Sequence, residues 1–231
     1  YLFSRNLIRS KNQFSKFRNR LQTSDRYESI EMDYGNTAMQ RRNSIRKQLM
    51  FDKSIIDIGC GEGFYAIPFA KNLNDDITYH AIDIVSELTE TVLKKASNKD
   101  VNNIAIYNHI DEYVETHQQD QSPVDVILTE VIEHMPIEDS KTLMQTVIDK
   151  INFDKFIVTV PNKDFNQFYM IEDPDFRHLD HDWEPTQREF EQLMTDMIPS
   201  NFKLEFIDIG DTVNGISTSI GCIITNIKDV D

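Results

Sequence analysis

The residues of this chain best suited to chemistry lie in one short stretch, residues 129–134 (TEVIEH). Two carboxylates and an imidazole follow an apolar run there, at Glu130, Glu133 and His134. In a helical turn, positions i, i+3 and i+4 fall on one face, so these side chains can point at one spot. Such ligands suit Mn²⁺ or Mg²⁺ better than Zn²⁺, because no cysteine is near. The stretch predicts a divalent metal site, and the alternative is a charged turn after a buried strand.

A second group of candidate ligands lies in the polar segment 177–184 (RHLDHDWE). Its histidines, His178 and His181, follow a strand expected at 155–160, so they should meet His134 over one edge of a sheet. Imidazole is a common ligand of divalent metals. Either histidine can supply the missing ligand, and the alternative is that both lie on the surface of a polar loop.

A glycine-rich turn, DIGCGEG, begins at Asp57 after a short apolar run and leads into a helix. Gly59, Gly61 and Gly63 permit positive φ angles and let a ligand approach the backbone, while the helix presents its first amides. The acidic setting disfavours a pyrophosphate. It suits a zwitterionic ligand such as S-adenosylmethionine, whose amino group can meet a carboxylate. We therefore assign Asp57 and the three glycines to cofactor binding.

Two further residues are assigned to the same cofactor site. Asp83 lies at the end of the apolar run 77–84, about twenty residues past the glycines, where a carboxylate can accept hydrogen bonds from both ribose hydroxyls. Thr129 follows the apolar run 124–128 and reaches the same edge of the expected sheet. The alternative for these features is a tight turn and an aspartate that caps a helix.

Strand and helix patterns alternate along the chain, which predicts an α/β fold with a parallel sheet and ligands at the carboxyl ends of its strands. Strands are expected at 53–58, 77–84, 104–107, 124–128, 155–160, 203–209 and 219–226. Helices are expected at 37–50, 86–98, 137–151 and 186–197, and the link 211–215 is consistent with a hairpin. An irregular insertion at about 161–185 follows a carboxyl end, where substrate contacts belong.

The charge of the chain is unevenly distributed. Residues 1–50 hold 11 basic and 4 acidic residues, whereas the rest of the chain holds 13 and 35, for a net charge of −15. A basic N-terminal part on an acidic body can steer a polyanion to one edge of the molecule. The alternative is a solvated helical surface. Within the helix at 37–50, we expect one buried face and one face for solvent or ligand. The buried face would hold Met39, Ile45 and Leu49, and the other Arg41, Arg42, Arg46 and Lys47.

The length and composition are typical of one soluble α/β domain, with 231 residues and 39% hydrophobic content. No apolar run approaches the roughly 18 residues of a membrane span. The two cysteines, Cys60 and Cys222, are too few for a disulfide framework. We therefore expect an intracellular, cytoplasmic protein that is a monomer. Because the sequence begins with Tyr1, an upstream domain or a protein partner is also expected.

The sequence resembles the small-RNA 3′-terminal 2′-O-methyltransferases over about residues 37–200. The resemblance rests on four motifs, which are DIGCGEG at 57–63, EVIEH at 130–134, VPNKDFN at 160–166, and RHLDHDWE at 177–184 followed by Thr186 and the REF of 188–190. The first motif is common to most class I methyltransferases. The fourth is the specific one. Two positions depart from the family pattern, Pro185 in place of a usual Trp and Gln187 in place of a usual Arg.

The resemblance implies a Rossmann-like class I methyltransferase with a mostly parallel seven-stranded sheet and helices on both faces. It divides the chain into a basic extension, residues 1–36, and a methyltransferase domain, residues 37–231. It also implies that Glu130, Glu133, His134 and His181 ligate Mg²⁺ or Mn²⁺, with His181 preferred to His178 because it fills the D-H position of the motif. The implied substrate is the single-stranded 3′ end of a small RNA.

The implied reaction is metal-dependent methyl transfer from S-adenosylmethionine to the terminal 2′-hydroxyl. A metal at the four ligands can orient the vicinal 2′ and 3′ hydroxyls and lower the pKa of the attacking oxygen. Two other readings stay open at this point. One is a metal-independent small-molecule methyltransferase of the same fold, and the other is a non-catalytic RNA-binding protein.

Overall fold

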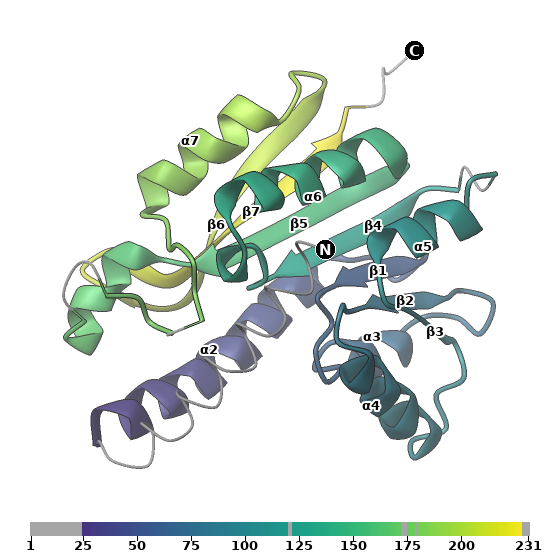
Figure 1. Ribbon diagram of the computed structural model, residues 1–231, viewed down its shortest axis with the longest axis horizontal. Helices are drawn as coiled ribbons and strands as arrows, with labels where there is room; N and C mark the ends of the chain where they lie inside the picture. Colours follow the sequence, from purple (N-terminus) through teal and green to yellow (C-terminus); the bar gives the residue numbers. More distant parts are fainter. Residues whose placement is uncertain (1–24, 120–121, 172–174, 179, 228–231) are drawn as a thin grey trace.

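The computed structural model describes residues 25–119, 122–171, 175–178 and 180–227, and it describes side chains of helix α2 from Asn36 onward. Its centre is a seven-stranded sheet in the order β3-β2-β1-β4-β5-β7-β6 (Figure 1). β7 runs antiparallel to both of its neighbours, β5 and β6, and the other four pairs of adjacent strands are parallel. The strands are β1 Ile55–Ile58, β2 Tyr79–Ile82, β3 Ile104–Tyr107, β4 Val124–Thr129, β5 Phe153–Pro161, β6 Phe202–Val213 and β7 Ile216–Asn226. The predicted α/β fold with a mostly parallel sheet is confirmed.

Helices cover both faces of the sheet, as predicted (Figure 1). One face packs against α5 Ile110–Thr116, α6 Ile137–Lys150 and α7 Gln187–Met197, and the other against α2 Asp25–Gln48, α3 Ala66–Ala70 and α4 Ser86–Ser97. Side chains of β4 alternate between the two cores, with Val126 and Leu128 in the first and Ile127 in the second. Two 3-10 helices, η1 Ile132–His134 and η2 Lys163–Tyr169, follow the carboxyl ends of β4 and β5.

The last two strands form a hairpin, and its turn is shorter than the expected link. The strands extend to Val213 and from Ile216, so only Asn214 and Gly215 connect them. Both residues have positive φ, 52° and 82°, as a two-residue type I′ turn requires. Among the described residues, no helix is long and apolar enough to cross a bilayer.

Helix α2 differs from its predicted form in extent and in orientation. It begins at Asp25, so the boundary expected at residue 36 falls inside the helix, while residues 1–24 lie outside the described part. Ile45 and Leu49 are buried as predicted. Met39 is wrongly placed in the buried face, since it is 43% exposed, and Arg41 is wrongly assigned to the outer face, since it is 3% exposed. The buried stripe follows an i, i+4 row through Arg41, whose charge is matched by an acid from another element.

Candidate active site at the carboxyl edge of the sheet

The glycine turn and the end of β2 are joined by one carboxylate. Gly59, Gly61 and Gly63 all have positive φ, at 75°, 54° and 79°, which explains the glycine at each position. The N–H of Gly61 donates to Asp83 Oδ2 at 2.9 Å, and the N–H of Val85 donates to Asp83 Oδ1 at the same distance. We call residues 59–63 together with Asp83 the donor loop.

The donor loop has an open side, and its Asp83 carboxylate can accept further hydrogen bonds. A Cβ built on Gly61 would meet no atom within 4 Å, so the backbone there faces open space. Burial raises the pKa of Asp83, and its two backbone hydrogen bonds oppose that shift. Each carboxylate oxygen can accept more than one hydrogen bond, so Asp83 retains capacity for a ligand hydroxyl. Its predicted contact with a ribose remains a prediction.

Asp57 lies beneath the donor loop rather than on its surface. The side chain is fully buried, and the Tyr79 hydroxyl donates to its Oδ2 at 2.7 Å. Burial raises the pKa of Asp57 to about 7, although the hydrogen bond from Tyr79 lowers it. Its Oδ1 has no hydrogen-bond partner among the described residues. The geometry shows a support for β1 and β2, and the predicted contact with a cofactor amino group stays a prediction.

Beyond β4, the chain turns sharply at Glu130. Thr129 is buried at the strand end, next to Thr159 of β5. Glu130 has a φ of 53°, a left-handed conformation that costs a residue with a Cβ about 1–2 kcal/mol and often occurs at functional sites. The helical turn expected from residue 130 therefore covers only Ile132–His134.

The Glu130 carboxylate is engaged by two side chains. Arg41 of α2 forms an ion pair with Glu130 Oε2 at 3.4 Å, and both side chains are about 5% exposed or less. The Thr159 hydroxyl donates to Glu130 Oε1 at 3.1 Å. Sequence patterns did not reveal this pair, because 89 positions separate the helix residue from the acid.

Glu133, His134 and His181 come together, and we call them the Glu133 cluster. One ligand atom from each residue lies within 4.8 Å of the others. Glu133 is fully buried, and neither of its carboxylate oxygens has a hydrogen-bond partner among the described residues. Burial raises the pKa of Glu133 to about 8, and the negative charge of Glu130 adds to the shift. A buried carboxylate with no hydrogen bond is costly unless a cation compensates it.

Each histidine of the Glu133 cluster is oriented by a second carboxylate. His134 Nδ1 lies 3.1 Å from Asp180 Oδ2, and His181 Nδ1 lies 2.5 Å from Glu184 Oε1. These contacts leave both Nε2 atoms for a ligand, and His134 Nε2 lies 4.0 Å from Glu133 Oε1. Metal-binding imidazoles are oriented in this way. The donor set and the orphaned carboxylate of Glu133 therefore fit a divalent cation.

The two flanking acids and His134 are charged when the cluster holds no cation. Burial would lower the pKa of His134, but the hydrogen bond to Asp180 and the charge of Glu133 outweigh it and raise the pKa to about 9. Burial would likewise favour neutral Asp180 and Glu184, but hydrogen bonds from His134 and His181 lower both pKa values, that of Asp180 to about 2. Metal binding must therefore displace a proton from His134.

Within the described part of the expected insertion, Arg177 and residues 180–184 form a hydrogen-bonded segment that supports the Glu133 cluster, and we call this segment the buried strut. Arg177 is 4% exposed, and its guanidinium donates to the Asn166 side chain and to backbone carbonyls of Asn162 and Thr218. Glu184 accepts hydrogen bonds from the Asn166 amide at 2.6 Å and from the Arg177 N–H at 2.7 Å. The sequence indicated a polar cluster here but not these burials.

The strut is also bonded directly to η1. The indole N–H of Trp183 lies 3.0 Å from the carbonyl oxygens of both Ile132 and Met135, and the Asp182 N–H donates to the Glu133 carbonyl at 2.8 Å. These bonds fix the 3-10 turn that carries two of the three cluster residues.

His178, the other candidate ligand, lies outside this cluster. Its ring centroid is 5.1 Å from that of His181. Burial lowers the pKa of His178 to about 4, and the nearby His181 adds to that shift, so its ring is neutral at pH 7. The preference for His181 agrees with the geometry, although metal binding itself remains a prediction.

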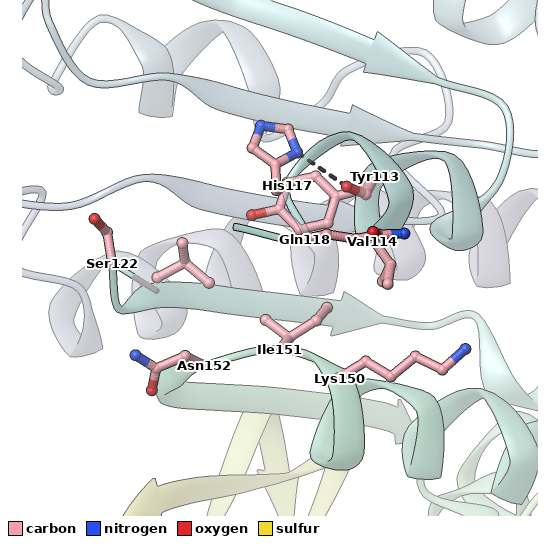
Figure 2. Close-up of a pocket in the computed structure, with 9 residues that line it drawn as sticks. Tyr113, Val114, His117, Gln118, Ser122, Lys150, Ile151 and Asn152 are labelled. Atoms are coloured by element: carbon pink, nitrogen blue, oxygen red, sulfur yellow. Dashed lines mark hydrogen bonds between the residues drawn. The ribbon is translucent and has the colours of Figure 1, made fainter. Parts of the chain in front are cut away.

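A separate cavity of about 260 Å³ lies far from these residues. It is lined by the end of α5, the start of β4, and the end of α6 with the link that follows it, including Tyr113, His117 and Lys150 (Figure 2). Because β4 enters at Val124 and leaves at Thr129, this cavity and the Glu133 cluster lie at opposite edges of the sheet. No residue assigned from the sequence lines it.

Comparison with known proteins finds relatives of one kind. The chain is 32% identical over 114 residues to a small RNA 2′-O-methyltransferase of Tetrahymena thermophila, covering 45% of this chain and 27% of that protein. It is 32% identical over 75 residues to a small RNA 2′-O-methyltransferase of Caenorhabditis elegans, covering 32% and 17%. The chain thus spans about a quarter or less of the length of these relatives.

Solved structures agree in fold. A chain in the structure of a Pnkp1/Rnl/Hen1 RNA repair complex is 28% identical, with a TM-score of 0.68 over 83% of this chain and 42% of that chain. The methyltransferase domain of bacterial CtHen1-C has a TM-score of 0.67 at 21% identity, over 83% of this chain and 99% of that chain. The second likeness shows the fold alone.

A family model also covers the site. The model described as a methyltransferase domain matches residues 51–204, which include the donor loop and the Glu133 cluster. With the Rossmann-like sheet, the glycine turn on β1 and an acid at the end of β2 in place, this chain belongs to the methyltransferase domain family.

Proposed function

We propose that this chain transfers a methyl group from S-adenosylmethionine to the 2′-hydroxyl of the 3′-terminal nucleotide of a small RNA. The two relatives named small RNA 2′-O-methyltransferase support this activity, although the matches cover only part of their length. We further propose that the acceptor is a single-stranded 3′ end and that the reaction requires Mg²⁺ or Mn²⁺.

The environment of the Glu133 carboxylate is the observation that supports the proposal most strongly. This carboxylate is fully buried without a hydrogen-bond partner among the described residues, and it faces two histidines that are each oriented by another acid. A general base for a small-molecule substrate would not need this arrangement. A cation between the three side chains explains it, so the metal-independent alternative is not favoured.

The donor loop is the proposed site of S-adenosylmethionine. Its open side at Gly61 leaves room for the methionyl part, and Asp83 can accept hydrogen bonds from the ribose hydroxyls. Thr129 and the Glu133 cluster lie at the same carboxyl edge of the sheet, beyond β4. The methyl donor and the acceptor hydroxyl would therefore approach each other at this edge.

The proposed mechanism assigns a holding role to the chain's own residues. Glu133, His134 and His181 would ligate the cation, while Asp180 and Glu184 fix the tautomers and orientations of the two imidazoles. A divalent cation supplies positive charge at a hydroxyl oxygen and favours a fixed arrangement of vicinal hydroxyls. This requirement for two vicinal hydroxyls explains a preference for a free 3′ end.

We include Glu130 as a fourth ligand, with one condition. Its carboxylate is paired with Arg41 and Thr159, so ligation by Glu130 requires a shift in the ion pair. The negative charge of Glu130 helps to raise the pKa of Glu133, so the two acids interact electrostatically.

The test is methyl transfer from labelled S-adenosylmethionine to single-stranded RNA of about ten nucleotides. Three 3′ ends are compared, a 2′,3′-diol, a 2′-deoxy end and a 3′-phosphate, each with EDTA or with added Mn²⁺. We expect transfer only to the diol end and only with metal. Transfer that survives EDTA, or that does not need the terminal 2′-hydroxyl, would contradict the proposal.

A further inference from the structure

Two pairs of consecutive residues, Arg41–Arg42 on α2 and Phe64–Tyr65 after the glycine turn, each place one side chain inward and one at the surface. The inward members are Arg41, which forms the ion pair with Glu130, and Tyr65, which is 7% exposed. Burial raises the pKa of Tyr65 to about 12, and the charges of Arg41 and Glu130 act on the same hydroxyl. The inner sides of both segments therefore reach the edge where the acceptor is expected.

The outward members, Arg42 and Phe64, contact each other at the surface. The Arg42 guanidinium lies over the Phe64 ring, 4.5 Å from its centroid. Arg42 also donates to the Phe64 carbonyl at 3.3 Å and to Met39 Sδ at 3.2 Å. These contacts hold the guanidinium in place, yet Phe64 remains 40% exposed and Met39 43% exposed. We call Arg42 and Phe64 the outer pair.

The charge around the outer pair is opposite to that of the whole chain. Residues 36–48 of α2 contain four basic residues and no acid, in a chain with a net charge of −15. Arg41 is paired with Glu130, and Asp211 accepts hydrogen bonds from Asn36 and Gln40, so the positive surface comes from the other three basic residues. Arg46 and Lys47 of this segment are exposed. The nearest acid of the glycine turn, Glu62, forms an ion pair with Lys95 at 3.0 Å. A polyanion would therefore meet a local positive surface here.

We propose that the outer pair binds the nucleotides that precede the methylated 3′-terminal nucleotide of a single-stranded RNA. This inference rests on the proposed function. A base stacks on the exposed part of the Arg42–Phe64 contact, and a phosphate lies against the Arg42 charge. Aromatic rings and guanidinium planes bind unstacked bases in this manner, with little dependence on base identity.

The position of the outer pair fits the preceding nucleotides rather than the terminal one. Arg41 and Arg42 are neighbours in the chain, but one points to Glu130 and the other to the surface. Consecutive residues of a helix project about 100° apart, so the two guanidiniums lie on different faces of α2. With the terminal ribose at the Glu133 cluster, the chain of phosphates leaves the site past the outer pair.

The test compares three variants with distinct expected signatures. Phe64→Ala should weaken binding of a fluorescein-labelled single-stranded RNA of about ten nucleotides, and raise its KM, by about tenfold with kcat little changed. Arg42→Gln should reduce the slope of log K against log salt by about 0.7, the value for one phosphate contact on a single strand. Phe64→Tyr, which retains stacking, should bind RNA as the wild type does.

The control is Lys94→Gln on α4, which removes an exposed positive charge that pairs with Glu90 and does not belong to the outer pair. Affinity for S-adenosylmethionine and the melting temperature are measured for every variant, because Phe64 follows the glycine turn. If Phe64→Ala does not fold, the salt slope of Arg42→Gln and the RNA affinity of Phe64→Tyr still test the inference.

The outcomes separate this inference from the proposed function. If the wild type methylates RNA and the outer-pair variants bind RNA unchanged, the inference is overturned and the activity stands. If the wild type binds RNA without methylating it, and the variants lose that binding, the activity fails and the inference stands. If RNA does not bind the wild type, both are overturned. The inference is also overturned if Lys94→Gln weakens RNA binding as much as Arg42→Gln does, because the effect of the charge is then general.

Discussion

The donor loop and the Glu133 cluster lie at the same edge of the sheet, but they satisfy their polar groups differently. In the donor loop, the Asp83 carboxylate accepts two backbone hydrogen bonds at 2.9 Å, so the loop is complete without a ligand. In the Glu133 cluster, a fully buried carboxylate has no hydrogen-bond partner among the described residues. The first region is organised by its own backbone, whereas the second leaves a buried carboxylate that the proposed cation would compensate.

The largest effect is expected from Glu133→Gln, which removes the charge that a cation would neutralise. Methyl transfer should fall to background, since the cluster loses its only carboxylate. Without metal, burial raises the pKa of Glu133 from 4.5 to about 8, so the variant should gain urea resistance relative to the wild type as the pH rises from about 4.5 to 8 and keep that gain above pH 8.

The matched control for this change is Glu90→Gln, a side chain 64% exposed on α4. It should leave both methyl transfer and urea resistance unchanged. Glu133→Gln with full activity would show that the buried carboxylate has no role in a metal site.

Glu184→Gln should have the next largest effect. This residue orients His181 without belonging to the cluster, and loss of such an outer contact typically costs about 10–100-fold in metal affinity or activity. Higher Mn²⁺ concentration should partly restore the rate, which is measured as activity against metal concentration. A loss of rate that Mn²⁺ does not change would instead indicate general damage to the buried strut.

Gly61→Ala should weaken cofactor binding with a smaller effect. Its φ of 54° makes a Cβ unfavourable by about 1–2 kcal/mol, and no atom lies within 4 Å of that Cβ, so the fold should persist. The added Cβ would occupy the open space proposed for the methionyl part, so the affinity for S-adenosylmethionine, measured by calorimetry, should fall by about tenfold, which corresponds to 1.4 kcal/mol.

Gly215→Ala provides the matching control in the distant hairpin. It also has a positive φ, 82°, and open space at its Cβ. Its stability loss should be similar to that of Gly61→Ala, but cofactor affinity should not change. Equal cofactor losses in the two variants would remove the distinction between the donor loop and an ordinary turn.

Asp57→Asn should have the smallest effect on methyl transfer, because Asp57 should act through the stability of the fold. Burial raises its pKa from 3.8 to about 7, so its contribution to folding is greatest below pH 4 and is lost as the pH rises through about 7. Asp57→Asn keeps an acceptor for the Tyr79 hydroxyl and removes the titration. The variant should gain stability relative to the wild type between pH 4 and pH 8, measured by urea unfolding. A constant difference across this range would contradict the assignment.

The donor loop could be predicted from sequence because its signals are local. The glycines and Asp83 follow short apolar runs, and each run is a parallel strand that ends at one edge. The alternation of strands and helices was sufficient to predict the sheet, and the helix expected at 186–197 is present as α7.

The surroundings of the Glu133 cluster could not be predicted in the same way, because they depend on contacts between distant segments. A helical pattern assigned Arg41 to the surface, since an arginine is rarely buried without a partner, and its partner Glu130 lies on another element. Likewise, the roles of Asp180 and Glu184 depend on how the insertion folds back onto η1. Hydrophobic periodicity contains no information about either.

The most direct test of the central claim is Mn²⁺ binding, followed by electron paramagnetic resonance of free Mn²⁺ during titration of the chain. Wild type, Glu133→Gln, His181→Asn and Glu90→Gln are compared. We expect saturable binding to the wild type and to Glu90→Gln, with binding lost or greatly weakened in the two cluster variants. Equal Mn²⁺ binding by all four proteins, or none by the wild type, would contradict a metal site at the Glu133 cluster.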